Sequence, residues 1–79
     1  MGKKILVVDD DFSIKYLMSK ILIDRGYSVN TADDGISALR ILDSDKFNVL
    51  ITDIKMPSMD GIELFNRVKN YILKCMWYF

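Results

Sequence analysis

The sequence has no histidine and a single cysteine, Cys75. A lone cysteine excludes an internal disulfide and a multi-cysteine zinc site, and the lack of histidine excludes an imidazole as metal ligand or general base. The 11 basic residues only balance the 11 acidic ones, so no basic face suggests nucleic acid as a partner. Any chemistry must come from carboxylate, lysine and hydroxyl groups.

The first apolar run, residues 5–8, is too short for the core of a signal peptide, and three aspartates follow it at once. We therefore expect a cytoplasmic protein that does not contact a membrane. With 79 residues, of which 51% are hydrophobic, the chain has room for one small domain over residues 1–79 and no more.

Acidic residues follow two short apolar runs, and this is the most informative pattern in the chain. Residues 5–8 lead into Asp9, Asp10 and Asp11, and residues 49–52 lead into Asp53. Apolar, β-branched runs of this length are typical of buried parallel strands. The carboxyl ends of such strands meet at the edge where open α/β sheets bind ligands. Converging carboxylates there predict a hard divalent cation and phosphate chemistry.

Hydrophobic periodicity predicts three strand–helix units. We expect strands at residues 4–8, 27–31 and 48–52, and helices at residues 12–25, after Asp34-Gly35, and from Asp60 onward. In the first helix one apolar stripe contains Ile14, Leu17, Met18, Ile21 and Leu22. Strands that alternate with helices predict an α/β fold with a parallel sheet of order 2-1-3, the first helix on one face and the other two on the opposite face.

Residues 71–79 form an apolar tail that fits two patterns. Val68, Ile72, Cys75 and Phe79 continue the spacing of the third helix, whereas the aromatic density of the tail suits an extended segment against the sheet. Because no glycine or proline separates the tail from the third helix, we expect that helix to continue to about residue 74.

Several motifs, in order and spacing, resemble those of one family. Residues 3–70 are similar to the receiver domain of bacterial two-component response regulators, over the N-terminal three-fifths of that domain, and so to a truncated flavodoxin-like fold. The motifs are Val7-Val8-Asp9-Asp10, Asp34-Gly35, Asp53, Lys55-Met56-Pro57 and Met59-Asp60-Gly61.

The resemblance implies a phosphoacceptor module of a phosphorelay rather than an enzyme. By it, Asp53 accepts the phosphoryl group, and Mg²⁺ or a similar cation is held by Asp10, by Asp9 largely through water, by Asp53 and by the backbone carbonyl of Lys55. A sensor histidine kinase or another phosphodonor is the implied partner. The cation is physically required, because a carboxylate that attacks a phosphoryl group brings negative oxygens together.

Each acidic residue taken alone has a simpler explanation. The run from Asp9 to Asp11 suits a helix N-cap next to the positive end of the helix dipole, worth about 1 kcal/mol, and an aspartate such as Asp53 is common in turns. The pairing of Asp53 with Asp9 and Asp10 at one predicted edge favours a metal site and leaves only the N-cap to Asp11. Asp34 and Asp60 are expected to begin helices without taking part in chemistry.

The family's fourth and fifth units are expected to be missing. They supply a switch hydroxyl, a phosphate-binding lysine and the surface that changes on phosphorylation, so we expect phosphorylation of Asp53 to be impaired. The third strand would then have one unpaired edge, which calls for a partner. We expect a homodimer through this strand or through the tail residues Ile72, Met76, Trp77 and Phe79.

Two other classes remain open. One is a non-catalytic module that associates with itself or caps an intact receiver. The other is an enzyme, because Asp9-x-Asp11-x-Ser13 after an apolar strand resembles the nucleophile motif of haloacid-dehalogenase-like phosphotransferases. The chain lacks room for the remaining motifs of that fold, so we favour the receiver.

Overall fold

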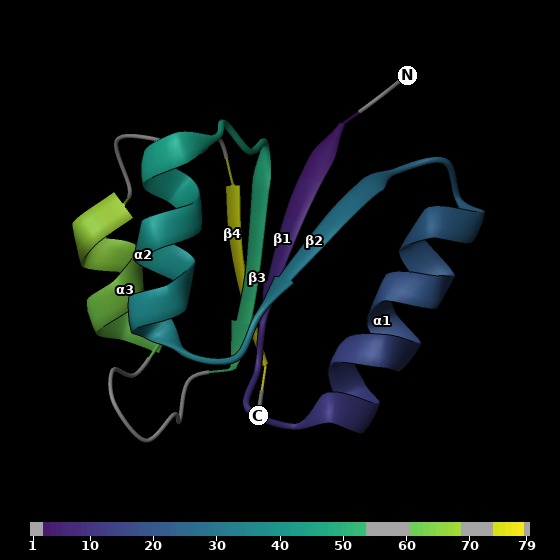
Figure 1. Ribbon diagram of the computed structural model, residues 1–79, viewed down its shortest axis with the longest axis horizontal. Helices are drawn as coiled ribbons and strands as arrows, with labels where there is room; N and C mark the ends of the chain where they lie inside the picture. The colour runs from purple at the N-terminus through teal and green to yellow at the C-terminus, as the bar shows by residue number, and fades with distance from the viewer. Residues whose placement is uncertain (1–2, 54–60, 69–73, 79) are drawn as a thin grey trace.

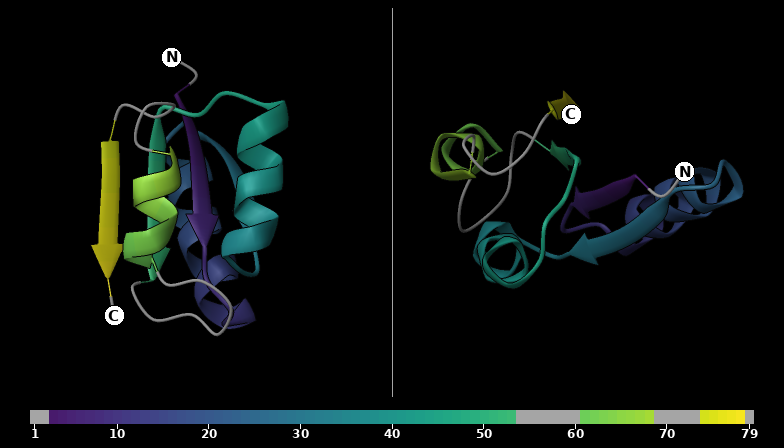
Figure 2. Two further views of the ribbon diagram at one scale, coloured as in Figure 1. Left: turned by 90° about the vertical axis from the view of Figure 1, so that its left-hand side faces the viewer. Right: turned by 90° about the horizontal axis from the view of Figure 1, so that it is seen from above.

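The computed structural model describes residues 3–53, 61–68 and 74–78, which form four strands and three helices. In chain order these are β1 (Lys4–Val8), α1 (Phe12–Asp24), β2 (Ser28–Ala32), α2 (Gly35–Ser44), β3 (Val49–Asp53), α3 (Gly61–Val68) and β4 (Lys74–Tyr78). The strands form one parallel sheet in the order β2-β1-β3-β4. Figure 1 and the view from above in Figure 2 show α1 on one face of this sheet and α2 and α3 on the other.

The α/β class and the 2-1-3 strand order predicted from the sequence are confirmed. Helix α1 ends one residue earlier than predicted, and β2 and β3 each lie one residue later. The shift in β3 makes Asp53 the last residue of the strand instead of the first residue after it.

The prediction of a helix that continues to about residue 74 was wrong at its end. Helix α3 ends at Val68, and Lys74–Tyr78 forms β4, which pairs in parallel with β3 from Val49↔Lys74 to Asp53↔Tyr78. Residues 69–73 lie outside the described ranges. Two effects outweigh the helical spacing: the segment is rich in residues that favour strands, and it satisfies the backbone groups along β3.

Pairing with β4 also changes the expectation of an unpaired third strand. Strand β3 has β1 on one side and β4 on the other, both within the same chain. The reason given for a dimer through β3 therefore does not hold, because no edge of that strand is left for a second copy.

The core lies between the sheet and the pair α2 and α3. One cluster of fully or nearly fully buried side chains comes from β1, β2, β3, these two helices and the connection between α2 and β3, and contains Leu6, Val8, Ala32, Ala38, Leu42, Phe47, Leu50 and Leu64. Side chains alternate along β1, so Ile5 and Val7 point to the opposite face, where α1 covers them. The described part of the chain has no helix long and apolar enough to span a bilayer.

Only part of the predicted stripe of α1 faces the sheet: Met18 and Leu22 are half-buried, whereas the other three residues are exposed. Ile14, Leu17 and Ile21 are 38%, 59% and 50% exposed. The residues turned inward are Lys15, Met18, Ser19 and Leu22, of which only Lys15 is buried. Because α1 carries apolar residues around most of its circumference, spacing alone could not select the inward side.

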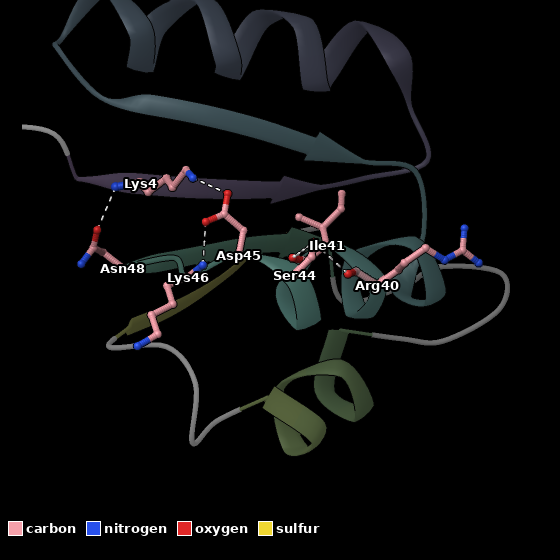
Figure 3. Close-up of polar contacts among 7 residues, drawn as sticks. All are labelled: Lys4, Arg40, Ile41, Ser44, Asp45, Lys46 and Asn48. Atoms are coloured by element: carbon pink, nitrogen blue, oxygen red, sulfur yellow. Dashed lines mark hydrogen bonds and ion pairs between the residues drawn. The ribbon is translucent and has the colours of Figure 1, made fainter.

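Hydrogen bonds and an ion pair align β1 with β3 at the end of these strands opposite Asp9 and Asp53 (Figure 3). The backbone N–H of Lys4 donates to Asn48 Oδ1 (2.8 Å), and the N–H of Asn48 donates to the Lys4 carbonyl (2.8 Å). The Lys4 ammonium pairs with Asp45, whose Oδ1 accepts the N–H of Lys46 (2.8 Å). These contacts align the two strands, and so determine which residues lie side by side where both strands end.

Candidate metal and phosphoacceptor site

Among the carboxylates whose side chains the structure describes, Asp9 is the most deeply buried. It directly follows β1 and is only 1% exposed. Its backbone N–H donates to the Ala32 carbonyl (3.1 Å) at the end of β2, and its Oδ1 accepts the N–H of Asp11 (2.9 Å). The carboxylate is therefore held in one orientation by the turn that it helps to form.

Asp10 and Asp11 are both exposed, but only Asp11 caps the helix that follows. Asp11 caps α1, because its Oδ1 accepts the N–H groups of Ser13 (2.8 Å) and Ile14 (3.3 Å). This agrees with the structural role expected for Asp11. Asp10 forms no ion pair within the described ranges. Its carboxylate lies at the solvent side of the same turn.

Strand register brings Asp53 to the same edge. Val8 pairs with Thr52 across β1 and β3, so Asp9 and Asp53 occupy the next positions on neighbouring strands. Neighbouring strands lie about 4.8 Å apart. The side chain of Asp53 and all of Lys55 lie outside the described residues, so of the predicted ligand set the structure shows Asp9, Asp10 and the backbone position of Asp53.

The donors at this edge fit a hard cation. They are carboxylate oxygens, which Mg²⁺ and Ca²⁺ prefer. Among the side chains that the structure describes, no group of three or more acidic, cysteine or histidine residues has metal-binding geometry. Of the predicted ligands, the described side chains are those of Asp9 and Asp10, and Mg²⁺ commonly keeps several waters beside one or two carboxylates.

Sequence reasoning missed an ion pair next to this edge. Lys15 is nearly buried beneath α1 and pairs with Asp33, which follows β2 and is exposed. Lys15 shares the inward side of α1 with Met18 and Leu22, and this spacing in the sequence was a signal that a lysine could lie underneath. A lysine on that side needs an acidic partner, and Asp33 is the one that the fold provides.

The structure is an open parallel α/β sheet with acidic residues at the carboxyl ends of its two central strands, β1 and β3. Proteins of this class bind ligands at that end of the sheet. The sequence model of one protein family, the response regulator receiver domain, matches residues 5–76 of this chain. The chain belongs to this family. The match extends into β4 and so covers nearly all of the chain.

Individual relatives agree with the family assignment. The chain is 38% identical over 69 residues to sporulation initiation phosphotransferase F of Bacillus subtilis, covering 87% of this chain and 56% of that protein. Among solved structures, it is similar to the chemotaxis protein CheY4 of Vibrio cholerae, with a TM-score of 0.85, 41% identity, and coverage of 89% of this chain and 58% of the other.

A second solved structure was determined with ligands. The response regulator TrrA of Thermotoga maritima, in complex with Mg²⁺-BeF, superposes with a TM-score of 0.82 and 37% identity over 86% of this chain and 59% of TrrA. The chain thus spans little more than half the length of these relatives, and 30% of the response regulator MprA of Mycobacterium bovis.

Proposed function

We propose that the chain is a phosphoacceptor receiver module that takes a phosphoryl group on Asp53 while Asp9, Asp10, Asp53 and the Lys55 carbonyl hold Mg²⁺. The observation that supports this most directly is the pairing of Val8 with Thr52, which puts Asp9 and Asp53 at adjacent positions where β1 and β3 end. The Mg²⁺ bound to the relative TrrA is consistent with a cation at this edge.

In the proposed reaction, a carboxylate oxygen of Asp53 forms a bond to phosphorus as the bond from phosphorus to the donor breaks. The donor keeps the electron pair of that bond, and the product is an aspartyl phosphate. A bound Mg²⁺ supplies charge neutralisation for the oxygens that approach one another. Asp9, oriented by its hydrogen bond from Asp11, contributes a fixed negative charge that positions the cation.

Receiver domains of this family interact with histidine kinases as phosphodonors. We propose a sensor histidine kinase, or another phosphodonor of the cytoplasm, as the source of the phosphoryl group for this chain. The chain is modified stoichiometrically in this scheme and turns over no substrate, so we propose that it is not an enzyme. No nucleic acid takes part in the proposal, since the overall charge is balanced.

Phosphorylation is tested with a small acyl-phosphate donor in the presence of Mg²⁺. We expect one added phosphoryl group in the intact mass, mapped to Asp53 by peptide analysis and absent in Asp53→Asn. Asp24→Asn is the matched control, because Asp24 is an exposed aspartate at the far end of α1. Modification that persists in Asp53→Asn would reject Asp53 as the acceptor.

Cation binding is tested separately by calorimetric titration with Mg²⁺. We expect a dissociation constant of about the millimolar order, as for sites with few protein carboxylates, and its loss in Asp10→Ala. Asp24→Ala should bind as the unsubstituted chain does. Equal binding by all three proteins would show that Asp10 is not a ligand.

We also keep the homodimer as a proposal, now without the contribution of β3. It supports the second candidate function, a self-associating receiver module. The observation that favours this candidate is the set of large apolar side chains that α1 exposes, including Ile14, Leu17 and Ile21. The mass of the chain in solution tests it.

A further inference from the structure

The turn between β1 and α1, residues 9–11, joins the candidate cation site to the start of a helix (Figure 1). The N–H of Asp11 donates to Asp9 Oδ1 (2.9 Å). The side chain of Asp11 accepts the N–H groups of Ser13 (2.8 Å) and Ile14 (3.3 Å). One residue therefore orients a proposed cation ligand with its backbone and caps α1 with its side chain.

Further contacts close this turn into a ring. The N–H of Lys15 donates to the carbonyl of Asp11 (3.2 Å), and the Lys15 ammonium pairs with Asp33. Ala32, which directly precedes Asp33, accepts the N–H of Asp9 (3.1 Å), so the series of contacts returns to the residue at which it began. The ring links the carboxyl ends of β1 and β2 to the first turn of α1.

We propose that Asp11 is a positioning residue for the cation site, and that cation binding and the first turn of α1 stabilise each other through it. The coupling rests on the proposed function, since it takes Asp9 as a ligand of Mg²⁺. The capping bonds hold the backbone of Asp11 in one extended conformation (φ −93°, ψ 116°), which sets the direction of the N–H that Asp9 accepts. Groups that fix the orientation of a metal ligand contribute to metal affinity although they do not touch the metal.

The two helices that follow β1 and β2 differ in how much such coupling can change. Helix α1 buries only Lys15, whereas α2 buries Gly35, Ala38 and Leu42, so the first turn of α1 depends more on its cap. Coupling between two equilibria is reciprocal. If the cap of α1 strengthens cation binding by some factor, the cation strengthens the cap by the same factor.

Helix α2 offers a matched control. Asp34 caps it in the same way, with Oδ1 accepting the N–H of Ser37 (2.8 Å), but this bond fixes the start of α2 and not the turn that holds Asp9. A variant that loses the cap of α2 therefore loses a helix cap of the same kind without a change in the ring.

Calorimetric titration of the four cap variants with Mg²⁺ tests the proposal. Asp11→Asn and Asp34→Asn lose the charge and keep a capping side chain, whereas Asp11→Ala and Asp34→Ala lose both. Comparison of alanine with asparagine at one position thus separates the cap from the charge. We expect the dissociation constant of Asp11→Ala to exceed that of Asp11→Asn by at least about threefold, and the two Asp34 variants to agree. Circular dichroism checks the fold of each variant.

Hydrogen exchange of the unsubstituted chain, read residue by residue, measures the reverse effect. Saturating Mg²⁺ should slow exchange of the capped N–H groups of Ser13 and Ile14 by at least about threefold, and should leave that of Ser37 at the start of α2 unchanged. A cap with a purely structural role would produce neither result, because it would stabilise α1 equally with and without the cation.

Three outcomes would overturn the coupling and leave the proposed cation site in place. They are equal Mg²⁺ affinity of Asp11→Ala and Asp11→Asn, an equal difference between the two Asp34 variants, and slowing of exchange at Ser37 that matches the slowing at Ser13. In each of them the unsubstituted chain still binds Mg²⁺. An unsubstituted chain that binds no Mg²⁺ would instead reject the cation site itself, and the coupling with it.

Discussion

The two faces of the sheet differ in how completely they are covered. On the side of α2 and α3, residues such as Leu6, Leu50 and Leu64 have no measurable exposure and form one continuous cluster. On the side of α1, the helix covers Ile5 and Val7 but leaves most of its own apolar side chains in solvent. The first face buries the larger apolar cluster, and the second leaves more apolar surface exposed to solvent.

The inward residues of the helices explain this contrast. Helix α2 buries Gly35, Ala38 and Leu42, which are small or apolar and allow close contact with the sheet. Helix α1 buries only Lys15, whose ammonium needs the carboxylate of Asp33. A helix that places a charged residue underneath buries less apolar surface of its own, so its N-cap and its ion pair make up a larger share of what holds α1 in place than they would in α2.

The largest expected effect compares the same substitution on the two faces. Leu50→Ala removes a fully buried side chain from the centre of the α2 face, and we expect a loss of about 3 kcal/mol in the free energy of unfolding. Leu17→Ala on α1, where the leucine is 59% exposed, should change it by less than about 0.5 kcal/mol. Urea denaturation measures both. Similar losses would mean that Leu17 is packed as closely as Leu50, which its exposure contradicts.

The sequence predicted the α2 face better than the α1 face, for a physical reason. Regular burial on both sides of β1 and β3 makes these strands recognisable as apolar runs, so the strand order followed from simple rules. In α1, Leu17 and Lys15 are both compatible with the helical period, and only the packed structure decides which one is inward. The tail was missed because pairing with β3, a contact distant in sequence, determines its conformation.

A second prediction concerns the charge beneath α1. Asp33→Asn removes the carboxylate from a nearly buried Lys15 ammonium, and we expect a loss of about 1–2 kcal/mol, between the values for surface and buried pairs, since Asp33 is 79% exposed on its side chain. Lys15→Met should cost less than Asp33→Asn, because it replaces the ammonium with an apolar chain of similar length.

The double variant completes this test. If the ion pair is what Asp33 contributes, Asp33→Asn should have little effect in a Lys15→Met background, measured by urea denaturation of all four proteins. Additive losses would indicate that Asp33 stabilises the turn after β2 on its own and that the α1 side does not depend on the pair.

For the candidate site too, the sequence predicted the positions of the acidic residues but not the differences between them. Acidic residues after two apolar runs were enough to expect Asp9, Asp10 and Asp53 at one edge, because parallel strands end together. The difference between them was not predictable. Asp9 is buried and oriented by the Asp11 N–H, whereas Asp10 is exposed, and that depends on the turn geometry after β1.

A smaller effect is expected at the start of α1. Asp11→Ala removes the side chain that caps Ser13 and Ile14, and we expect a loss of about 1 kcal/mol. Asp11→Asn, which can still cap, should restore most of it. Because α1 has little apolar packing to compensate, hydrogen exchange in Asp11→Ala should accelerate more in α1 than in α2. Equal acceleration would indicate that the two helices unfold only together.

The smallest expected effect is a loss of stability at low pH that involves two aspartates at the ends of α2. The backbone N–H of Ser37 lowers the pKa of Asp34, the N-cap of α2, and the hydrogen bond from the Lys4 side chain lowers the pKa of Asp45 at the other end of this helix. Both groups therefore release their protons more readily in the folded chain than in the unfolded one. Their contribution to stability is present above about pH 4, the ordinary range of aspartate, and is lost as pH falls through the lowered native values.

Asp34→Asn isolates this contribution, because asparagine keeps the cap and does not titrate. We expect the urea midpoint of the unsubstituted chain to fall between about pH 4 and pH 2, and the fall to be shallower in Asp34→Asn and in Asp45→Asn. Asp24→Asn at the end of α1 is the control. A control as shallow as the two α2 variants would show that acid acts through the overall charge of the chain, and that the ends of α2 have no special part in its stability.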